Sequence, residues 1–320
     1  MIAGPRLSDL GGPPFAAFGV SVVGFPSRDV PPFGLGLRPT TGALGSLRNQ
    51  VLHTLVRRTL FAGMTDAVNE VRADFGLPAR DEIVFEYMLH ASLYLQLGAK
   101  GFEYPQRNLP EHVRFVGPVR PLPVQGWTEP DWWSDLDAGK PVIVLNQGTV
   151  ATDPTELLQP GLAALAGEDV LVVAVTGGRD PRELGPLPAN ARVERFIPFD
   201  RLLPRADVLV TNAGFGAVQL ALAAGVPIVA AGKTEDKVEV AARVGWSGVG
   251  INLRTQTPRP EAITAAVRQV LGDERFRRRA AELQLEIAST GRELAAAEEL
   301  EKLLSGAATD RGSRPSRAGR

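Results

Sequence analysis

Residues 207–253, DVLVTNAGFGAVQLALAAGVPIVAAGKTEDKVEVAARVGWSGVGINL, decide the fold. Their apolar runs at 207–211, 226–232 and 248–253 do not alternate with polar residues, and segments of helical length separate them. Such runs are typical of parallel strands that are covered by helices on both faces. The stretch therefore predicts successive strand–helix–strand units of a parallel sheet.

The alternation of apolar runs and segments of helical length continues on both sides of this stretch. Apolar runs lie at 141–146, 169–177 and 192–197, and the spacing of apolar residues predicts a helix over 261–271, followed by a charge-rich helical end over 273–303. Strands that alternate with helices indicate an α/β domain with a parallel sheet. We expect this domain to occupy residues 141–304.

The first 117 residues are less regular. Residues 46–75 have helical spacing, with Gly63 as a candidate point of interruption. Residues 92–97 and 112–117 resemble strands, too few for a closed sheet. Residues 1–117 are therefore predicted to form a partial N-terminal domain.

Two further segments have distinctive compositions. Residues 118–140 carry four prolines and three tryptophans, which disfavour regular structure, so we interpret them as an interdomain linker. Residues 305–320 combine small residues with arginines and lack apolar periodicity, which predicts a disordered tail.

Composition excludes several classes of protein. The chain has 320 residues, 44% of them hydrophobic and 22% charged, with a net charge of −1, values of a globular protein without bulk attraction for nucleic acid or membranes. The absence of cysteine rules out a disulfide scaffold, a thiolate metal site and a cysteine nucleophile. Pro13 and Pro14 interrupt any signal-peptide core, and no apolar run approaches 18 residues, so we predict a cytoplasmic protein without a membrane span.

Two glycine-bearing turns follow predicted strands. Gln147-Gly148-Thr149 comes after the first strand of the second half, and 212–217 lies between a strand and a helix. Small residues at a helix start leave amide donors unshielded, which suits a phosphate or diphosphate. Strand-ending turns without a ligand remain the alternative for both. The second turn also partly matches G-x-G-x-x-G, which leaves an NAD-dependent oxidoreductase as a further hypothesis, although Gln219 replaces the third glycine.

Four elements in fixed order carry a family resemblance: Phe196-Ile197-Pro198, the turn 212–217, Ala224-Gly225-Val226-Pro227 and Asp236-Lys237. Together they resemble the nucleotide-sugar segment of UDP-glycosyltransferase-type enzymes, especially bacterial ones that glycosylate natural products. The likeness covers 140–271 and reaches into 26–117 through SRDVPPFGLGL, FEYP and HVRFVGP. It implies the GT-B fold, two Rossmann-like domains with parallel sheets, of which the N-terminal one is expected to be incomplete.

The resemblance implies roles for particular residues. Phe196 would stack on the base of the donor, and the turns would hold its diphosphate. Asn212 stands where many relatives have a phosphate-binding histidine, and Lys237 stands where they have a glutamine beside the sugar. Asp236 would accept hydrogen bonds from sugar hydroxyls. The predicted donor-binding residues are Gly148, Thr149, Phe196, Pro198, Asn212, Gly214, Phe215, Gly216, Ala217, Asp236 and Lys237.

Two other positions depart from the family pattern. Leu220 occupies the place of a carboxylate for the ribose, and Phe199 replaces a glutamine near the base. UDP- and dTDP-linked sugars therefore both remain open as donors.

The implied activity is transfer of a hexose, with inversion, from a nucleotide diphosphate sugar to a hydroxyl of a small lipophilic acceptor, without a metal or cofactor. Relatives use a histidine base near the start of their first domain, and we expect this chain to begin after that point. We assign the role to none of His53, His90 and His112, so weak or no transfer is expected. We interpret the D-x-D sequence 135–137 as a turn rather than a metal site.

One alternative comes from another class of function. The chain would then be a non-catalytic nucleotide-binding or partner module of a transferase, which docks a protein partner at the incomplete domain.

Overall fold

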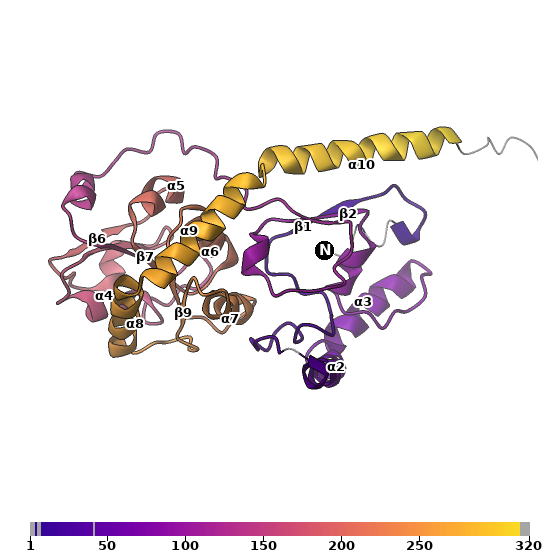
Figure 1. The fold of residues 1–320 in the computed structure, drawn as a ribbon, viewed down its shortest axis with the longest axis horizontal. Coiled ribbons are helices and arrows are strands. Elements are labelled where there is room, and N and C mark those ends of the chain that lie inside the picture. The colour runs from indigo at the N-terminus through magenta and orange to yellow at the C-terminus, as the bar shows by residue number, and fades with distance from the viewer. Residues whose placement is uncertain (1–3, 5–7, 41, 314–320) are drawn as a thin grey trace, which may run out of the picture.

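A computed structural model describes residues 4, 8–40 and 42–313. It contains two parallel β-sheets, which lie in two halves of the molecule joined by irregular segments and by a C-terminal helix pair (Figure 1). The α/β architecture with parallel sheets predicted from the sequence is confirmed. The domain boundaries after residues 117 and 140 remain predictions.

The first sheet has three parallel strands in the order β1-β2-β3. The predicted strands are confirmed as β2 (Leu93–Gln96) and β3 (Val113–Phe115), whereas β1 (Ala16–Gly19) was not predicted. The expected helix over 46–75 consists of two helices, α2 (Gly42–Arg58) and α3 (Ala62–Asp74), and two short 3-10 helices follow, η1 (Glu86–His90) and η2 (Lys100–Phe102).

The second sheet has six parallel strands in the order β6-β5-β4-β7-β8-β9. All six predicted strands are present: β4 (Val142–Asn146), β5 (Leu171–Val175), β6 (Ala191–Glu194), β7 (Val208–Thr211), β8 (Ile228–Ala230) and β9 (Gly250–Asn252). The connecting helices are α4 (Leu158–Leu165), η4 (Pro181–Leu184), α5 (Phe199–Leu202), η5 (Leu203–Arg205), α6 (Phe215–Ala223), α7 (Lys237–Ser247) and α8 (Pro260–Gly272).

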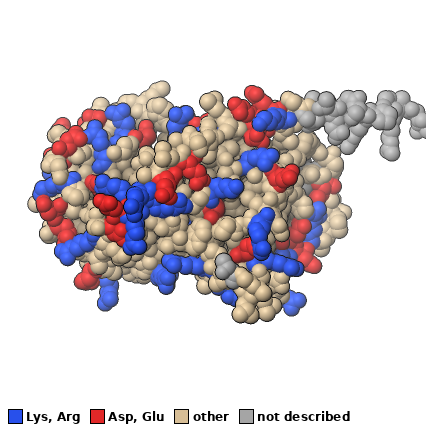
Figure 2. Space-filling view, viewed as in Figure 1, with Lys and Arg blue, Asp and Glu red and all other residues tan. Residues whose placement is uncertain are grey.

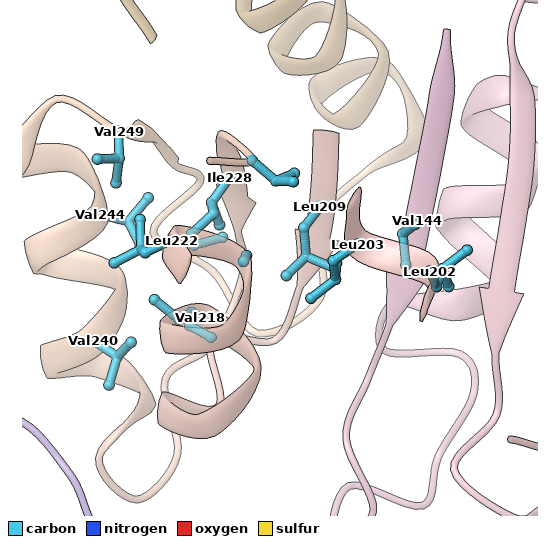
Figure 3. Packing of buried hydrophobic residues seen from close by; sticks show 14 of the residues in the cluster. Val144, Leu202, Leu203, Leu209, Val218, Leu222, Ile228, Val240, Val244 and Val249 are labelled. Atoms are coloured by element: carbon cyan, nitrogen blue, oxygen red, sulfur yellow. The ribbon is translucent and has the colours of Figure 1, made fainter. Parts of the chain in front are cut away.

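Alternate residues of the inner strands belong to two separate cores. In β4, Val142 and Val144 join the core under α6, α7 and α9, whereas Ile143 and Leu145 join the core under α4 and α8. Figure 3 shows the first of these cores, in which Val218 of α6 lies among apolar side chains of neighbouring elements. Coverage on both faces explains why these strands read as unbroken apolar runs.

The segment 118–140 forms one short 3-10 helix, η3 (Trp133–Asp137), and is otherwise irregular. Its tryptophans pack on the core of the second half, and the Trp132 indole donates to Glu194 at 2.9 Å. Asp135 and Asp137 each form an ion pair with an arginine of the second half. Asp135 lies 2.7 Å from Arg192, and Asp137 lies 2.5 Å from Arg205. The D-x-D sequence thus fastens this segment to the second half.

Two C-terminal helices connect the halves. After α9 (Glu274–Ser289), the positive φ of Gly291 and Arg292 turns the chain into α10 (Glu293–Ser313). Figure 1 shows α10 running beside the first half, where Ala296 packs against Leu93, Leu95 and Val116. The helix extends to Ser313, into the segment 305–320 that the sequence predicts to be disordered, and 314–320 lie outside the described residues. The disordered tail stays a prediction.

This packing predicts the effect of a charge at Ala296. Replacing Ala296 by glutamate buries an unpaired carboxylate against the first sheet, and we expect the free energy of unfolding to fall by about 2 kcal/mol. The matched control is the same substitution at the exposed neighbour Ala297, which should change stability by less than about 0.5 kcal/mol. Urea denaturation measures both, and equal losses would contradict the docking of α10.

The halves also meet through a buried charge cluster. Arg243 of α7 is fully buried and pairs with Glu103 of the first half at 2.7 Å and with Glu239 at 3.0 Å. Burial alone would lower the pKa of Arg243, but the two carboxylates outweigh burial and raise it. The remaining oxygen of each carboxylate accepts backbone amides: Val23 donates to Glu103, and Gly34 and Gly36 donate to Glu239. Both carboxylates therefore contact the one guanidinium and also accept hydrogen bonds from backbone amides.

The surface carries charges of both signs. On the face shown in Figure 2, lysine and arginine intermingle with aspartate and glutamate over both halves. Within the described part of the chain, no helix has the length and apolarity needed to cross a bilayer.

Candidate active site

The order of the second sheet creates a crevice. The chain builds outward from β4 to β5 and β6, then returns to add β7 on the other side of β4. Consecutive connections therefore leave β4 and β7 in opposite directions, and α4 and α6 cover different faces. In open α/β sheets this reversal of strand order is where ligands bind, beyond the carboxyl ends of the strands. Both predicted glycine turns lie there.

The turn after β4 presents Thr149 to solvent. Gly148 adopts a positive φ of 74°, which favours glycine, and its amide donates to the Asn146 side chain at 3.1 Å. That amide therefore already has a partner within the turn, and the role of Gly148 beside a diphosphate stays a prediction. Thr149 is exposed, and its hydroxyl has no hydrogen-bond partner among the residues that the structure describes.

The turn after β7 leads into α6. Ala213 has a positive φ of 64°. The N-cap residue is Gly214, which has no side chain to accept a hydrogen bond from the first amides of the helix. The first turn of α6 contains Phe215, Gly216 and Ala217, whose backbone amides have no acceptor within the helix. They form a small donor array at the positive end of the helix dipole.

Asn212 joins the two turns. Its side chain is 2% exposed, its amide nitrogen donates to the Gln147 carbonyl, and its oxygen accepts from the Gly214 amide at 3.4 Å. Asn212 thus holds the backbone of both turns in place, with one bond from each end of its amide.

Asp236 and Lys237 follow β8, next to β7. The Asp236 carboxylate accepts a hydrogen bond from Ser21 of the first half at 2.5 Å. Lys237 is buried and pairs with Glu235. Asp236 therefore faces the first half across the crevice, whereas the Lys237 ammonium is committed to its own turn. Ser21 was not found by sequence reasoning, because nothing in VSVVGF marks it.

Phe196 and Pro198 follow β6, at the outer edge of the sheet. The Phe196 side chain is 52% exposed, and Pro198 is buried as the N-cap of α5. The ring of Phe196 is available for stacking, while Pro198 shapes the chain behind it.

Gln219 shows why the turn differs from a dinucleotide fingerprint. Its side-chain oxygen accepts the Ala99 amide of the first half at 3.0 Å, and the residue is 1% exposed. A third glycine would allow the helix to pack closely on the strand. Here that position joins the two halves, which weakens the oxidoreductase hypothesis.

Two of the three histidines are bound away from the two turns. The His53 ring lies 3.1 Å from the carbonyls of Ser27 and Val30, and His90 contacts Glu82 at 2.9 Å. Burial, with a smaller effect of Arg114, lowers the pKa of His112. Among the described residues, no group of three or more histidine or carboxylate side chains is arranged to hold a metal ion.

Comparisons with known proteins agree with this geometry. Residues 159–303 match the family described as erythromycin biosynthesis protein CIII-like, C-terminal domain. The chain is 48% identical over 285 residues to 4'-demethylrebeccamycin synthase of Lentzea aerocolonigenes, covering 88% of this chain and 67% of that protein. The chain belongs to the UDP-glycosyltransferase-type glycosyltransferases.

Other members of this glycosyltransferase family are also similar. UDP-glycosyltransferase 2 of Phaeomoniella chlamydospora is 35% identical over 269 residues, which cover 81% of this chain and 59% of that protein. Among solved structures, the calicheamicin glycosyltransferase CalG4 superposes with a TM-score of 0.70 at 26% identity, over 95% of this chain and 71% of that chain. The GT-B fold is thereby confirmed, and the chain spans about three fifths to two thirds of these curated relatives.

Proposed function

We propose that this chain binds the donor of a hexosyl transfer, a nucleotide diphosphate sugar, at the carboxyl ends of β4, β6, β7 and β8. The observation that carries this proposal is the array of unpaired amides at the start of α6, placed at the reversal of strand order. The names of the relatives agree with it. The first half would contribute to the binding of a small lipophilic acceptor.

The spacing of the strands suits a nucleotide. Phe196 follows β6 and Thr149 follows β4, and these strands are separated only by β5. Two strand spacings amount to about 10 Å, near the separation between the base and the diphosphate of an extended nucleotide. Phe196 would stack on the base, while Thr149 and the amides of α6 would hold the phosphates.

The proposed chemistry is a direct displacement with inversion. The acceptor oxygen attacks the anomeric carbon, the bond from that carbon to the phosphate oxygen breaks, and the nucleotide diphosphate leaves with the electron pair. The amides of α6 would stabilise the charge that grows on the leaving group. Asp236 would orient the sugar by accepting hydrogen bonds from its hydroxyls, which would replace the hydrogen bond from Ser21. The acceptor hydroxyl must also lose its proton, which would pass to solvent water because we assign no residue of this chain as the base. Two of the three histidines hold other partners, so we expect slow or no transfer by this chain.

A second candidate function is docking of a polypeptide at the first half. The outer edge of β1 has no strand beside it among the described residues, and Phe18 and Val20 are 51% and 70% exposed. An unpaired strand edge invites pairing with another strand. In that case the chain would serve as a nucleotide-binding module of a transferase.

Titration calorimetry with UDP and dTDP tests the donor proposal. We expect binding of at least one of them with a dissociation constant below 1 mM, and no binding of NAD. The VinC glycosyltransferase structure contains dTDP, so both nucleotides are worth comparing. Absence of binding of both nucleotides at millimolar concentration would overturn the proposal. Copurification of a defined polypeptide that restores transfer would favour the docking function.

A further inference from the structure

Arg179, in the loop after β5, is an unusual cation. One of its terminal nitrogens, Nη1, donates to the Ala151 carbonyl at 2.6 Å. The other, Nη2, is buried and has no hydrogen-bond partner among the described residues. A buried charged donor without a partner is costly, so such a group calls for an explanation.

No described carboxylate compensates Arg179. The acid beside it in sequence, Asp180, lies within ion-pairing distance of Arg182 at 4.0 Å and Arg195 at 3.2 Å instead. The guanidinium thus adds an uncompensated positive charge to the loop after β5.

The loop of Arg179 touches the turn that carries Gly148 and Thr149. A Cβ atom on Gly177 would lie 2.6 Å from the Gly148 carbonyl, which shows how closely the two loops approach. Ala151 belongs to the same connection as Thr149, and its carbonyl also lies 3.4 Å from the Gln147 side chain. Arg179 therefore lies against the turn proposed to hold the diphosphate.

We propose that Arg179 provides the positive charge for the donor diphosphate, the charge that Asn212 cannot supply. This inference rests on the proposed donor site. The geometry suits two effects: the bond to Ala151 holds the turn after β4 in place, and the guanidinium charge attracts the phosphates at short range. The recognised chemistry is a phosphate oxyanion, whichever base the nucleotide carries.

The test compares UDP, UMP and uridine in titration calorimetry of the full chain and of Arg179→Gln and Arg179→Lys. Glutamine keeps a donor for Ala151 but removes the charge, and lysine keeps the charge. We expect Arg179→Gln to weaken UDP binding about tenfold, UMP less, and uridine not at all, with Arg179→Lys in between. If dTDP is the tighter nucleotide, the thymidine series replaces the uridine series.

The matched control is Arg182→Gln, which removes the same charge from an exposed side chain of η4, in the same connection between β5 and β6, and should leave UDP affinity within about twofold. Unchanged UDP affinity in Arg179→Gln, or an equal loss for UDP and uridine, would overturn the inference. If the unsubstituted chain binds neither UDP nor dTDP, the donor site itself fails, which is a distinct outcome. A thermal melt of each variant separates lost affinity from lost folding.

Discussion

Replacing Arg243 by methionine should lower the free energy of unfolding by about 3–5 kcal/mol. The substitution leaves the carboxylates of Glu103 and Glu239 buried, with 5% and 3% of their side chains exposed, and without their cation. It also removes the guanidinium that lies 4.1 Å from the Tyr104 ring centroid. Urea denaturation followed by tryptophan fluorescence measures the loss.

The control is Arg268→Met, which breaks the ion pair with Glu168 on the surface of the second half. The Arg268 side chain is 68% exposed, so its pair should contribute less than about 1 kcal/mol. A loss for Arg243→Met no larger than that for Arg268→Met would show that the halves are not joined by this cluster.

Replacing Gly216 by aspartate should weaken UDP or dTDP binding about a hundredfold while the fold is kept. A Cβ atom at Gly216 meets no atom within 4 Å, and its φ is not in the left-handed region, so the side chain fits. A carboxylate in the first turn of α6 interacts favourably with the helix dipole, which should raise stability by about 0.3–1 kcal/mol. The same charge repels the diphosphate proposed to bind there.

Gly216→Ala separates size from charge, since alanine adds the Cβ atom alone. It should retain nucleotide affinity within about threefold. Calorimetry gives the affinities, and thermal unfolding gives the stabilities. If Gly216→Asp binds UDP as well as the unsubstituted chain does, the amides of α6 do not hold the diphosphate.

The second sheet could be predicted because its four inner strands, β4, β5, β7 and β8, are buried along their whole length. Burial on both faces requires successive residues such as 142–145 to be apolar, and this signal is local. The strand β1 gives no such signal. It has four residues, AAFG, of which Phe18 is exposed, and prolines and glycines surround it. Its pairing with β2 joins Ala16 to Leu93, far along the chain.

The candidate site was only partly predictable for the same reason. The turns of Gly148 and Asn212 follow strands that the sequence reveals, and parallel strands bring their carboxyl ends together. The contacts that complete the site join distant residues without a pattern. Ser21 reaches Asp236 across 215 residues, and Arg179 meets Ala151 from the next loop. The sequence also does not reveal which backbone amides already have a hydrogen-bond partner. The amide of Gly148, which donates to Asn146, is an example.

The return of α10 to the first sheet bears on how hybrid enzymes could be assembled from this chain and a relative. A single crossover within 118–140 would pair the strand Leu93–Gln96 of one parent with the helix Glu293–Ser313 of the other. It would likewise split Glu103 from its guanidinium partner. A viable hybrid needs a second crossover near Gly291, so that the terminal helix and the first sheet, against which it packs, come from the same parent.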